Sequence, residues 1–249
     1  ELLWLIYKLE NQAKDKGGRV HYLLGNHEYM ILQNDLRYLT DKYVSSSKLL
    51  GIDYDKLYGN KTIIGRWLRS KPAIIKLNNI VFTHGGVSEK FLEKYGLDLD
   101  SINAMMRKNN IYTKEQLKST DYYDLYYGKN SLIWYRGYFE KYFESYKANL
   151  TDSDLDKVLK LLNAKTIIVG HTTQEEIVSK FKNKINHDFN ILISCVRKSV
   201  VPSIYLKKKF KIKIINIHIQ EPKVSLDNFD FVVAPEHDGL IGKNVLTSK

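Results

Sequence analysis

Three histidines of this chain each follow a short apolar run and have a glycine within two residues. They lie in Gly25-Asn26-His27-Glu28, Thr83-His84-Gly85-Gly86 and Gly170-His171-Thr172, after the apolar runs 20–24, 80–82 and 166–169. Such runs predict strands, and α/β proteins display catalytic side chains where strands end. Neighbouring glycines let a ligand approach the backbone closely. The repeated pattern favours one shared site, although each histidine alone is more often a half-buried, hydrogen-bonded residue.

The side chains in these loops suit a transition metal and a proton transfer. Asn26 offers an amide oxygen, and His84 and His171 offer imidazole nitrogens. This set suits Mn, Fe or Zn, is poor for Ca and unfavourable for Mg. Such a metal polarises phosphoryl oxygens and lowers the pKa of bound water toward about 7. His27 is next to a ligand rather than being one, so it is placed to protonate a leaving alkoxide.

A further candidate is Arg136, which lies in the aromatic stretch 133–139 within a region rich in tyrosine. A guanidinium group pairs with phosphate through two parallel hydrogen bonds, so Arg136 could hold a substrate phosphate. The alternative is a surface arginine stacked on tyrosines. The stretch by itself favours that alternative.

The elements that must position these residues follow from apolar periodicity and capping signals. In the first part of the chain we expect helices over 2–13, about 28–39, parts of 41–70, 88–127 and 151–162, strands over 19–24 and 165–171, and a hairpin over 72–84. Beyond residue 184 we expect strands over 189–194, 212–219 and 231–234, with a helix over about 202–210. The pattern predicts an α/β fold.

Composition limits the partners and the compartment. The net charge is +11, but the lysines are spread along the chain, and no arginine-rich or aromatic-interleaved motif indicates nucleic-acid binding, which we consider unlikely. The single cysteine excludes internal disulfides. No apolar run has membrane-spanning length and no signal peptide is visible, which favours the cytoplasm. The chain opens without Met inside a predicted helix, so we expect an internal fragment whose true N-terminus and localisation are unknown.

Four motifs in order carry a family resemblance over about residues 1–184. They are Asn26-His27-Glu28, His84-Gly85-Gly86, Trp134-Tyr135-Arg136-Gly137 and Gly170-His171-Thr172. They resemble the later motifs of the calcineurin-like metallophosphoesterases, in particular the Shewanella-like branch of the phosphoprotein phosphatases. The resemblance implies an αββα sandwich that holds two metals and hydrolyses phosphomonoesters. Glu28 favours a phosphorylated protein or small phosphomonoester as substrate over a diadenosine polyphosphate.

The resemblance also implies roles for individual residues. Asn26, His84 and His171 would bind the second metal, His27 would be the general acid, and Arg136 would bind substrate phosphate. The two earlier family motifs, which supply the first metal's own ligands, the bridging Asp and a second phosphate-binding arginine, are absent from this sequence. We therefore expect residues 1–184 to form an incomplete αββα metallophosphoesterase sandwich that binds at most one metal and whose activity is impaired.

The tail shows a different resemblance. Residues 190–249, with Pro235-Glu236-His237-Asp238-Gly239 and Gly242-Lys243-Asn244-Val245, resemble the mitochondrial-fission elongated-mitochondria family, whose fold is similar to nucleotide-sugar glycosyltransferases. We expect residues 185–249 to be a partial β-α-β-β (Rossmann-like) fragment, separate from the phosphatase sheet. This part supports an alternative function, a nucleotide-sugar-binding or glycosyltransferase-like module. His237-Asp238 is equally well explained as a turn. A join near 185 indicates a fusion, either natural or a gene-model artefact.

Overall fold

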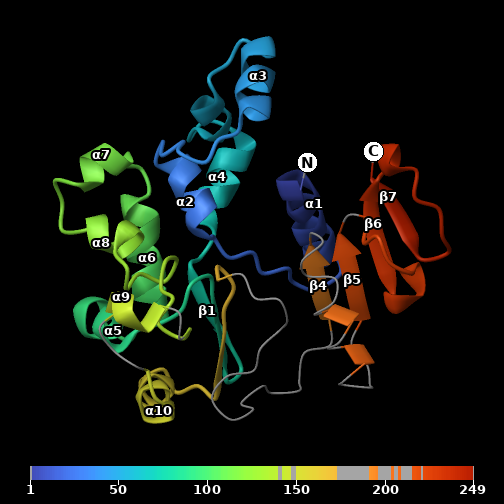
Figure 1. Ribbon diagram of the computed structural model, residues 1–249. Helices are drawn as coiled ribbons and strands as arrows, with labels where there is room; N and C mark the ends of the chain where they lie inside the picture. The colour runs from blue at the N-terminus through green and yellow to red at the C-terminus, as the bar shows by residue number, and fades with distance from the viewer. Residues whose placement is uncertain are drawn as a thin grey trace. The chain divides into compact units, whose positions relative to one another are not determined.

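The computed structural model describes residues 2–139, 142–146, 150–172, 191–195, 203–204, 207–208, 215–219 and 221–248 (Figure 1). The chain divides into two compact units, Glu1–Thr172 and Thr173–Lys249. The boundary predicted at 184/185 lies outside the described residues and stays a prediction. Among the described residues, no helix combines the length and the apolar character needed to cross a bilayer.

The first unit is mainly helical with one small sheet. Its elements are α1 (Leu2–Asp15), α2 (Asn26–Leu32), α3 (Asp41–Leu49), η1 (Tyr54–Tyr58), α4 (Ile63–Ser70), β1 (Ile74–Leu77), β2 (Ile80–Thr83), α5 (Glu89–Tyr95), α6 (Leu99–Asn109), α7 (Lys114–Leu117), α8 (Tyr123–Tyr127), α9 (Phe143–Tyr146), α10 (Asp152–Leu161) and β3 (Thr166–Ile168). Side-chain caps start several helices: Ser88 accepts from Phe91 N, and Thr151 forms a capping box with Asp154. The short helices predicted in 41–70, the hairpin and the capped helix are confirmed.

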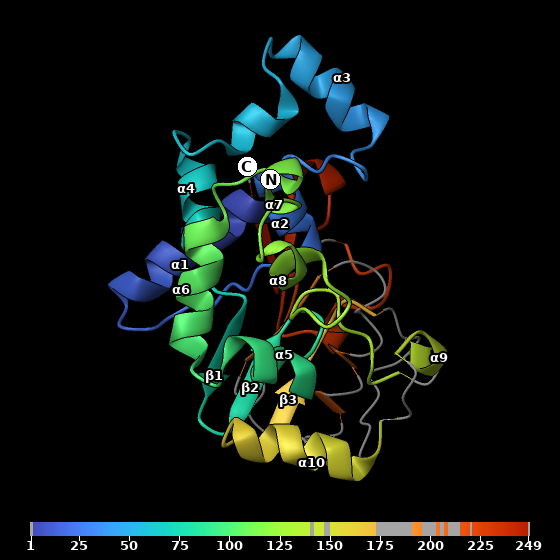
Figure 2. The same cartoon turned by 90° about the vertical axis from the view of Figure 1, so that its left-hand side faces the viewer.

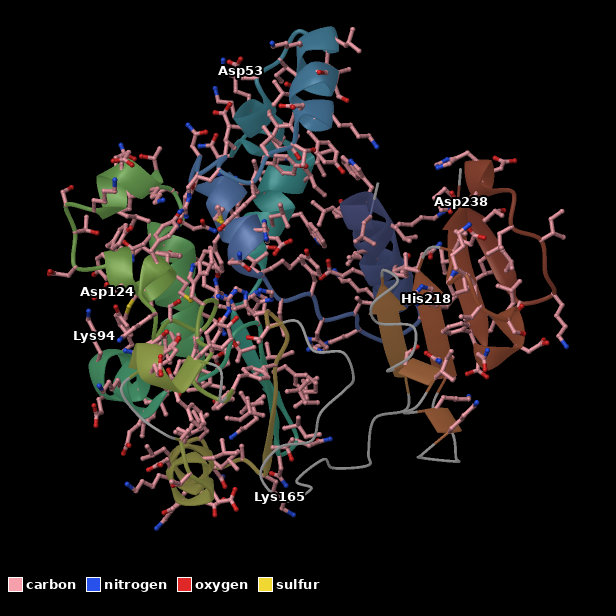
Figure 3. All side chains as sticks on the ribbon, in the orientation of Figure 1. Asp53, Lys94, Asp124, Lys165, His218 and Asp238 are labelled. Atoms are coloured by element: carbon pink, nitrogen blue, oxygen red, sulfur yellow. The ribbon has the colours of Figure 1, made fainter. Side chains whose placement is uncertain are left out.

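The sheet of the first unit has the order β1-β2-β3. β1 and β2 form an antiparallel hairpin, with Asn78 in the left-handed conformation at the turn (φ 54°). β2 and β3 are parallel, so their carboxyl ends lie at the same edge of the sheet. Figure 2 shows the three strands side by side, with α10 near the end where β3 begins. Lys165, labelled in Figure 3, directly precedes this strand and donates its backbone N–H to Asn79 O at 2.7 Å.

The core of this unit packs helices against the hairpin. Its fully buried residues include Leu68, Ile74, Val81, Ile102, Met106 and Leu125. A buried amide joins α6 to β1, because Asn103 accepts from Ala73 N at 2.9 Å and donates to Ile74 O at 2.7 Å. At the surface Lys94 pairs with Asp124 at 3.2 Å and connects α5 with α8 (Figure 3).

Two predictions around the first histidine loop were wrong in detail. Residues 19–24 form no strand: among the described residues, the one backbone bond that they make outside the regular elements runs from Leu24 N to Pro72 O at 3.1 Å. A strand needs a ladder of such bonds. The helix predicted over 28–39 starts at Asn26 and ends at Leu32. The chain reverses there, since Asn34 is left-handed (φ 58°) and Asp35 N donates to Met30 O at 2.8 Å.

The second unit contains a separate parallel sheet of order β4-β5-β6-β7. The strands are β4 (Ile191–Cys195), β5 (Ile215–Ile219), β6 (Phe231–Pro235) and β7 (Val245–Ser248), with the short helices η4 (Leu226–Asn228) and η5 (Glu236–Asp238). Because β5 pairs with β4 and β6, it does not extend the first sheet, as predicted. The strand β7 was not predicted from the sequence. The carboxylate of Asp230 joins β5 by accepting from Asn216 N at 2.6 Å.

Candidate active site

The structure brings Asn26, His84 and His171 together. Asn26 Oδ1 lies 2.8 Å from His84 Nε2 and 3.1 Å from His171 Nδ1. The third distance, between His84 Nε2 and His171 Nδ1, is 3.1 Å, and the two ring centroids are 4.9 Å apart. The three atoms therefore form a nearly equilateral triangle, built from residues that are far apart in the chain. Below, we call this arrangement the donor triangle.

Parallel strands account for the meeting of the two histidines. His84 follows β2 directly and His171 follows β3 by three residues, and β2 and β3 end at the same edge. Gly170 N donates to His84 O at 2.8 Å, which fixes one loop against the other. His171 itself is left-handed (φ 55°), a conformation that costs free energy for a residue with a side chain. Non-glycine strain of this kind clusters at functional sites.

Asn26 is delivered by the start of α2. It is the first residue of this helix, and it is buried. The carboxylate of Glu28 accepts from Gly25 N at 2.8 Å and completes a capping arrangement that fixes the loop. Gly25 is required for a steric reason, since a Cβ there would lie 2.8 Å from both Cε1 and Nδ1 of His84. The absence of a side chain at Gly25 thus makes room for the His84 ring.

Burial, reinforced by nearby basic side chains, keeps both imidazoles of the donor triangle neutral. Burial lowers the pKa of His84 to about 4, with His27 and Arg136 acting in the same direction. Burial likewise lowers the pKa of His171 to about 3, reinforced by Arg136, His84 and His27. Neutral imidazole is the form that binds a metal. These electrostatic effects also place His27 and Arg136 in the neighbourhood of the triangle.

The spacing of the donor triangle fits a single divalent ion. For metal–ligand distances near ~2.1 Å, adjacent ligands are separated by roughly 3.0 Å in an octahedron and roughly 3.4 Å in a tetrahedron. The observed 2.8–3.1 Å is close to one face of an octahedron. Within the described ranges, no metal site could be made of three or more His, Cys, Asp and Glu side chains. The donor triangle has two histidines, and its third donor is the amide oxygen of Asn26. The residues present therefore fit one ion.

Arg136 is half-buried and lies near enough to His84 and His171 to lower the pKa of both imidazoles. Its guanidinium stacks over the ring of Tyr142 at 5.2 Å, so the aromatic stacking considered for this stretch does occur. Its Nε is buried and has no hydrogen-bond partner among the described residues, which leaves a donor for a ligand. Trp134, two residues earlier, meets the His171 ring edge-on at 5.4 Å. Arginine stacking and phosphate binding are thus compatible here.

His27 is exposed and does not belong to the donor triangle. Its ring lies 5.3 Å from the ring of Tyr38, and both residues line a cavity of about 240 Å³. Tyr43, Tyr54 and Tyr58 also line this cavity. The general-acid role expected for His27 stays a prediction.

Sequence reasoning missed the residues that support these side chains. Tyr146 at the end of α9 and Tyr142 just before that helix contact Arg136, but only a crowding of tyrosines marks them in the sequence. Asp35 is buried where the chain leaves α2, lines the same cavity as His27, and forms ion pairs with Arg37 and Lys114. No spacing signal distinguishes it from other aspartates. The metal-ligand and catalytic roles assigned to the five predicted residues stay predictions.

Two family models match this chain. The family model for calcineurin-like phosphoesterases matches residues 2–175, and the model for mitochondrial fission ELM1 matches residues 141–249. The cold-active protein-tyrosine phosphatase of a psychrophilic Shewanella species is 43% identical, with a TM-score of 0.67 over 74% of this chain and 53% of that one. The predicted resemblances of both parts are therefore supported by matches.

Two curated relatives are Shewanella-like protein phosphatases. Shewanella-like protein phosphatase 1 of Plasmodium berghei is 27% identical over 68% of this chain and 46% of its own length. Shewanella-like protein phosphatase 2 of Arabidopsis thaliana is 25% identical over 70% of this chain and 53% of its own length. The chain thus spans about half the length of these relatives. Because the phosphoesterase family model matches well over half of the sequence, this chain belongs to the calcineurin-like phosphoesterase family.

Proposed function

We propose that this chain is a metal-dependent phosphoesterase that hydrolyses phosphomonoesters, and that phosphoproteins are its substrate class. The observation that carries the proposal is the donor triangle of Asn26, His84 and His171. Arg136 and His27 nearby support it. Calcineurin-like phosphoesterases use divalent metals, and the named relatives are protein phosphatases.

Each side chain has a separate task in this proposal. The triangle would hold the ion through two neutral imidazoles and one amide oxygen. When bound, the ion supplies charge that polarises a phosphoryl oxygen and acidifies water. Arg136 would orient the phosphate through its guanidinium, whose Nε is buried and unpartnered in the part of the chain that the structure describes. His27 would donate a proton to the leaving oxygen as the ester bond breaks.

We further propose that this chain binds at most one ion, of Mn, Fe or Zn. A two-metal site stabilises both the attacking and the leaving oxygen with ions about 3.5–4 Å apart. The donor triangle serves one position and contains no carboxylate to neutralise the ion. Turnover should therefore be far slower than in relatives that carry two metals. Metal analysis of the purified chain tests this, and two bound ions per chain would contradict it.

The substrate proposal rests on relatives and on the cavity next to His27. A solved relative is described as a protein-tyrosine phosphatase. In this chain the cavity beside His27 has four tyrosines among its lining residues, Tyr38, Tyr43, Tyr54 and Tyr58. An aromatic leaving group would find stacking partners there. A small aryl phosphate is therefore a suitable artificial substrate.

The test is hydrolysis of p-nitrophenyl phosphate by the purified chain with Mn²⁺. We expect slow turnover that a chelator abolishes and that His84→Ala removes. His21→Ala is the matched control, because His21 is exposed and is not part of the donor triangle. Turnover that survives both chelation and His84→Ala would refute the proposed function.

A second candidate function concerns the second unit. In parallel sheets, ligands bind outside the carboxyl ends of the strands. Here β6 ends at Pro235, and η5 follows, closed by the left-handed Gly239 (φ 62°). The match to the ELM1 family model covers this segment. A nucleotide-sugar-binding role predicts saturable binding of a UDP-sugar, and its absence at millimolar concentration would exclude this role.

A further inference from the structure

Arg136 is held by two tyrosines of one short segment. The Tyr142 ring lies under the guanidinium, 5.2 Å from its Cζ. Tyr146 contacts the backbone of Arg136: its hydroxyl oxygen accepts from Arg136 N at 3.0 Å. The same hydroxyl donates to Lys129 O at 2.7 Å. One phenol group thus uses its donor and its acceptor to join two backbone groups.

The Tyr146 ring is fixed by its surroundings. It meets the Tyr135 ring edge-on, at 5.2 Å and 80°. Lys129 contacts the same ring, with its Nζ 5.5 Å from the centroid of Tyr146. This Nζ also donates to Ser145 O at 3.0 Å. Aromatic and cation–π contacts of this kind favour one orientation of the ring. The hydroxyl is therefore directed at the Arg136 peptide.

The anchored peptide is also connected to the histidine loops. A Cβ at Gly85, next to His84, would lie 2.8 Å from Tyr135 N, so the two backbones are in close contact. Gly85 N donates to Leu132 O at 2.6 Å. The backbone of the Arg136 segment is therefore fixed relative to His84. At Arg136 itself the carbonyl accepts from Phe139 N at 3.1 Å, and the N–H is held by Tyr146.

We propose that Tyr146 is a positioning residue that fixes the Arg136 backbone, so that the guanidinium faces the donor triangle before a phosphate binds. This deepens the proposed function and rests on it. An arginine side chain loses considerable rotamer entropy when it is fixed on a ligand. Holding the backbone with Tyr146 and the guanidinium with Tyr142 reduces that loss in advance. Preorganisation of this kind increases affinity without a new contact to the ligand.

The experiment compares Tyr146→Phe with wild type, using inorganic phosphate as the probe in the presence of Mn²⁺. Tyr146→Phe keeps the ring and removes only the hydroxyl. We expect phosphate affinity to fall roughly 3- to 10-fold, the ratio that one hydrogen bond supports. KM for p-nitrophenyl phosphate should rise by a similar factor, kcat should change less than about 2-fold, and Mn²⁺ affinity should stay unchanged.

Tyr126→Phe is the matched control. The Tyr126 hydroxyl also donates to a backbone carbonyl, that of Met106, but in the buried core. We expect it to lower thermal stability without changing phosphate affinity. Equal losses of phosphate affinity in both variants would overturn the proposal, because the effect would then be general loosening of the fold.

Arg136→Gln separates the inference from the function on which it rests. If Arg136→Gln loses phosphate affinity and Tyr146→Phe does not, Tyr146 has no positioning role and the proposed function stands. If Arg136→Gln keeps wild-type phosphate affinity, the phosphate role of Arg136 is wrong and the inference falls with it.

Discussion

Gly25→Ala should damage the donor triangle without removing any of its atoms. A Cβ at position 25 would lie 2.8 Å from Cε1 and Nδ1 of His84 and 3.0 Å from Oε2 of Glu28. The backbone of Gly25 is extended (φ −93°, ψ −175°), which any residue adopts, so the substitution causes no backbone strain. The effect is therefore a collision between a methyl group and the His84 ring.

The size of the effect follows from the distances. Carbon atoms in contact prefer roughly 3.5–4.0 Å, so the ring must move by about 0.7 Å or more. His84 Nε2 lies at a corner of a triangle whose sides are 2.8–3.1 Å. Functional sites tolerate displacements of only about 0.5 Å, and disturbing the support of a ligand costs about 10- to 100-fold in metal affinity. We expect a loss of this size, equivalent to about 1.4–2.7 kcal/mol.

The assay is competition for Mn²⁺ or Zn²⁺ against a fluorescent chelator, with circular dichroism to check folding. Gly170→Ala is the matched control, because its Cβ would lie 3.7 Å from His84 O and 3.9 Å from His84 Nδ1, which are ordinary contacts. We expect Gly170→Ala to bind metal within about 3-fold of wild type. Wild-type metal affinity in a folded Gly25→Ala chain would refute the steric argument or the ligand role of His84.

Three further results are expected. His171→Ala should reduce metal affinity at least about 100-fold by removing one donor of the triangle, as measured by metal retained after dialysis. Burial would raise the pKa of Asp35, but hydrogen bonds from Arg37 and Lys114 outweigh it and hold the pKa below 3.8. Its stabilisation is therefore present above pH 3.8 and lost as the pH falls below that value, so urea unfolding should show Asp35→Asn costing about 1–3 kcal/mol at pH 7 and less at pH 3. Gly65→Ala should destabilise the first unit by about 1–3 kcal/mol in the same assay, because its Cβ would collide with the backbone at the end of η1.

The motifs predicted that Asn26, His84 and His171 meet, and the structure brings these three together. Short apolar runs before His84 and His171 predicted neighbouring strand ends, and these runs pair as β2 and β3. The apolar run 20–24 gave the same local signal and formed no strand, because strand formation depends on a neighbour that local periodicity does not contain. Asn26 still reaches the site, since the start of α2 rather than a strand end positions it.

The residues that support the site could not be predicted, because their contacts also depend on other parts of the chain. Tyr146 acts on Arg136 through a hydroxyl that bridges two backbone groups, and such a contact has no characteristic spacing. Gly25 could be recognised as part of a motif, but its steric role depends on the position of His84, 59 residues later. In the tail, β7 has the sequence Val-Leu-Thr-Ser, and its two apolar residues do not make the longer apolar run from which the other strands were predicted.

The donor triangle joins points that are 58 and 87 residues apart along the chain. An ion held there would act as a cross-link that closes two long loops, each of which is entropically costly to form. The triangle exists only after β2 and β3 have paired, so the unfolded chain offers no comparable site. Metal would then stabilise the native state by mass action. If the strands pair after the folding transition state, the ion would slow unfolding and leave the folding rate nearly unchanged.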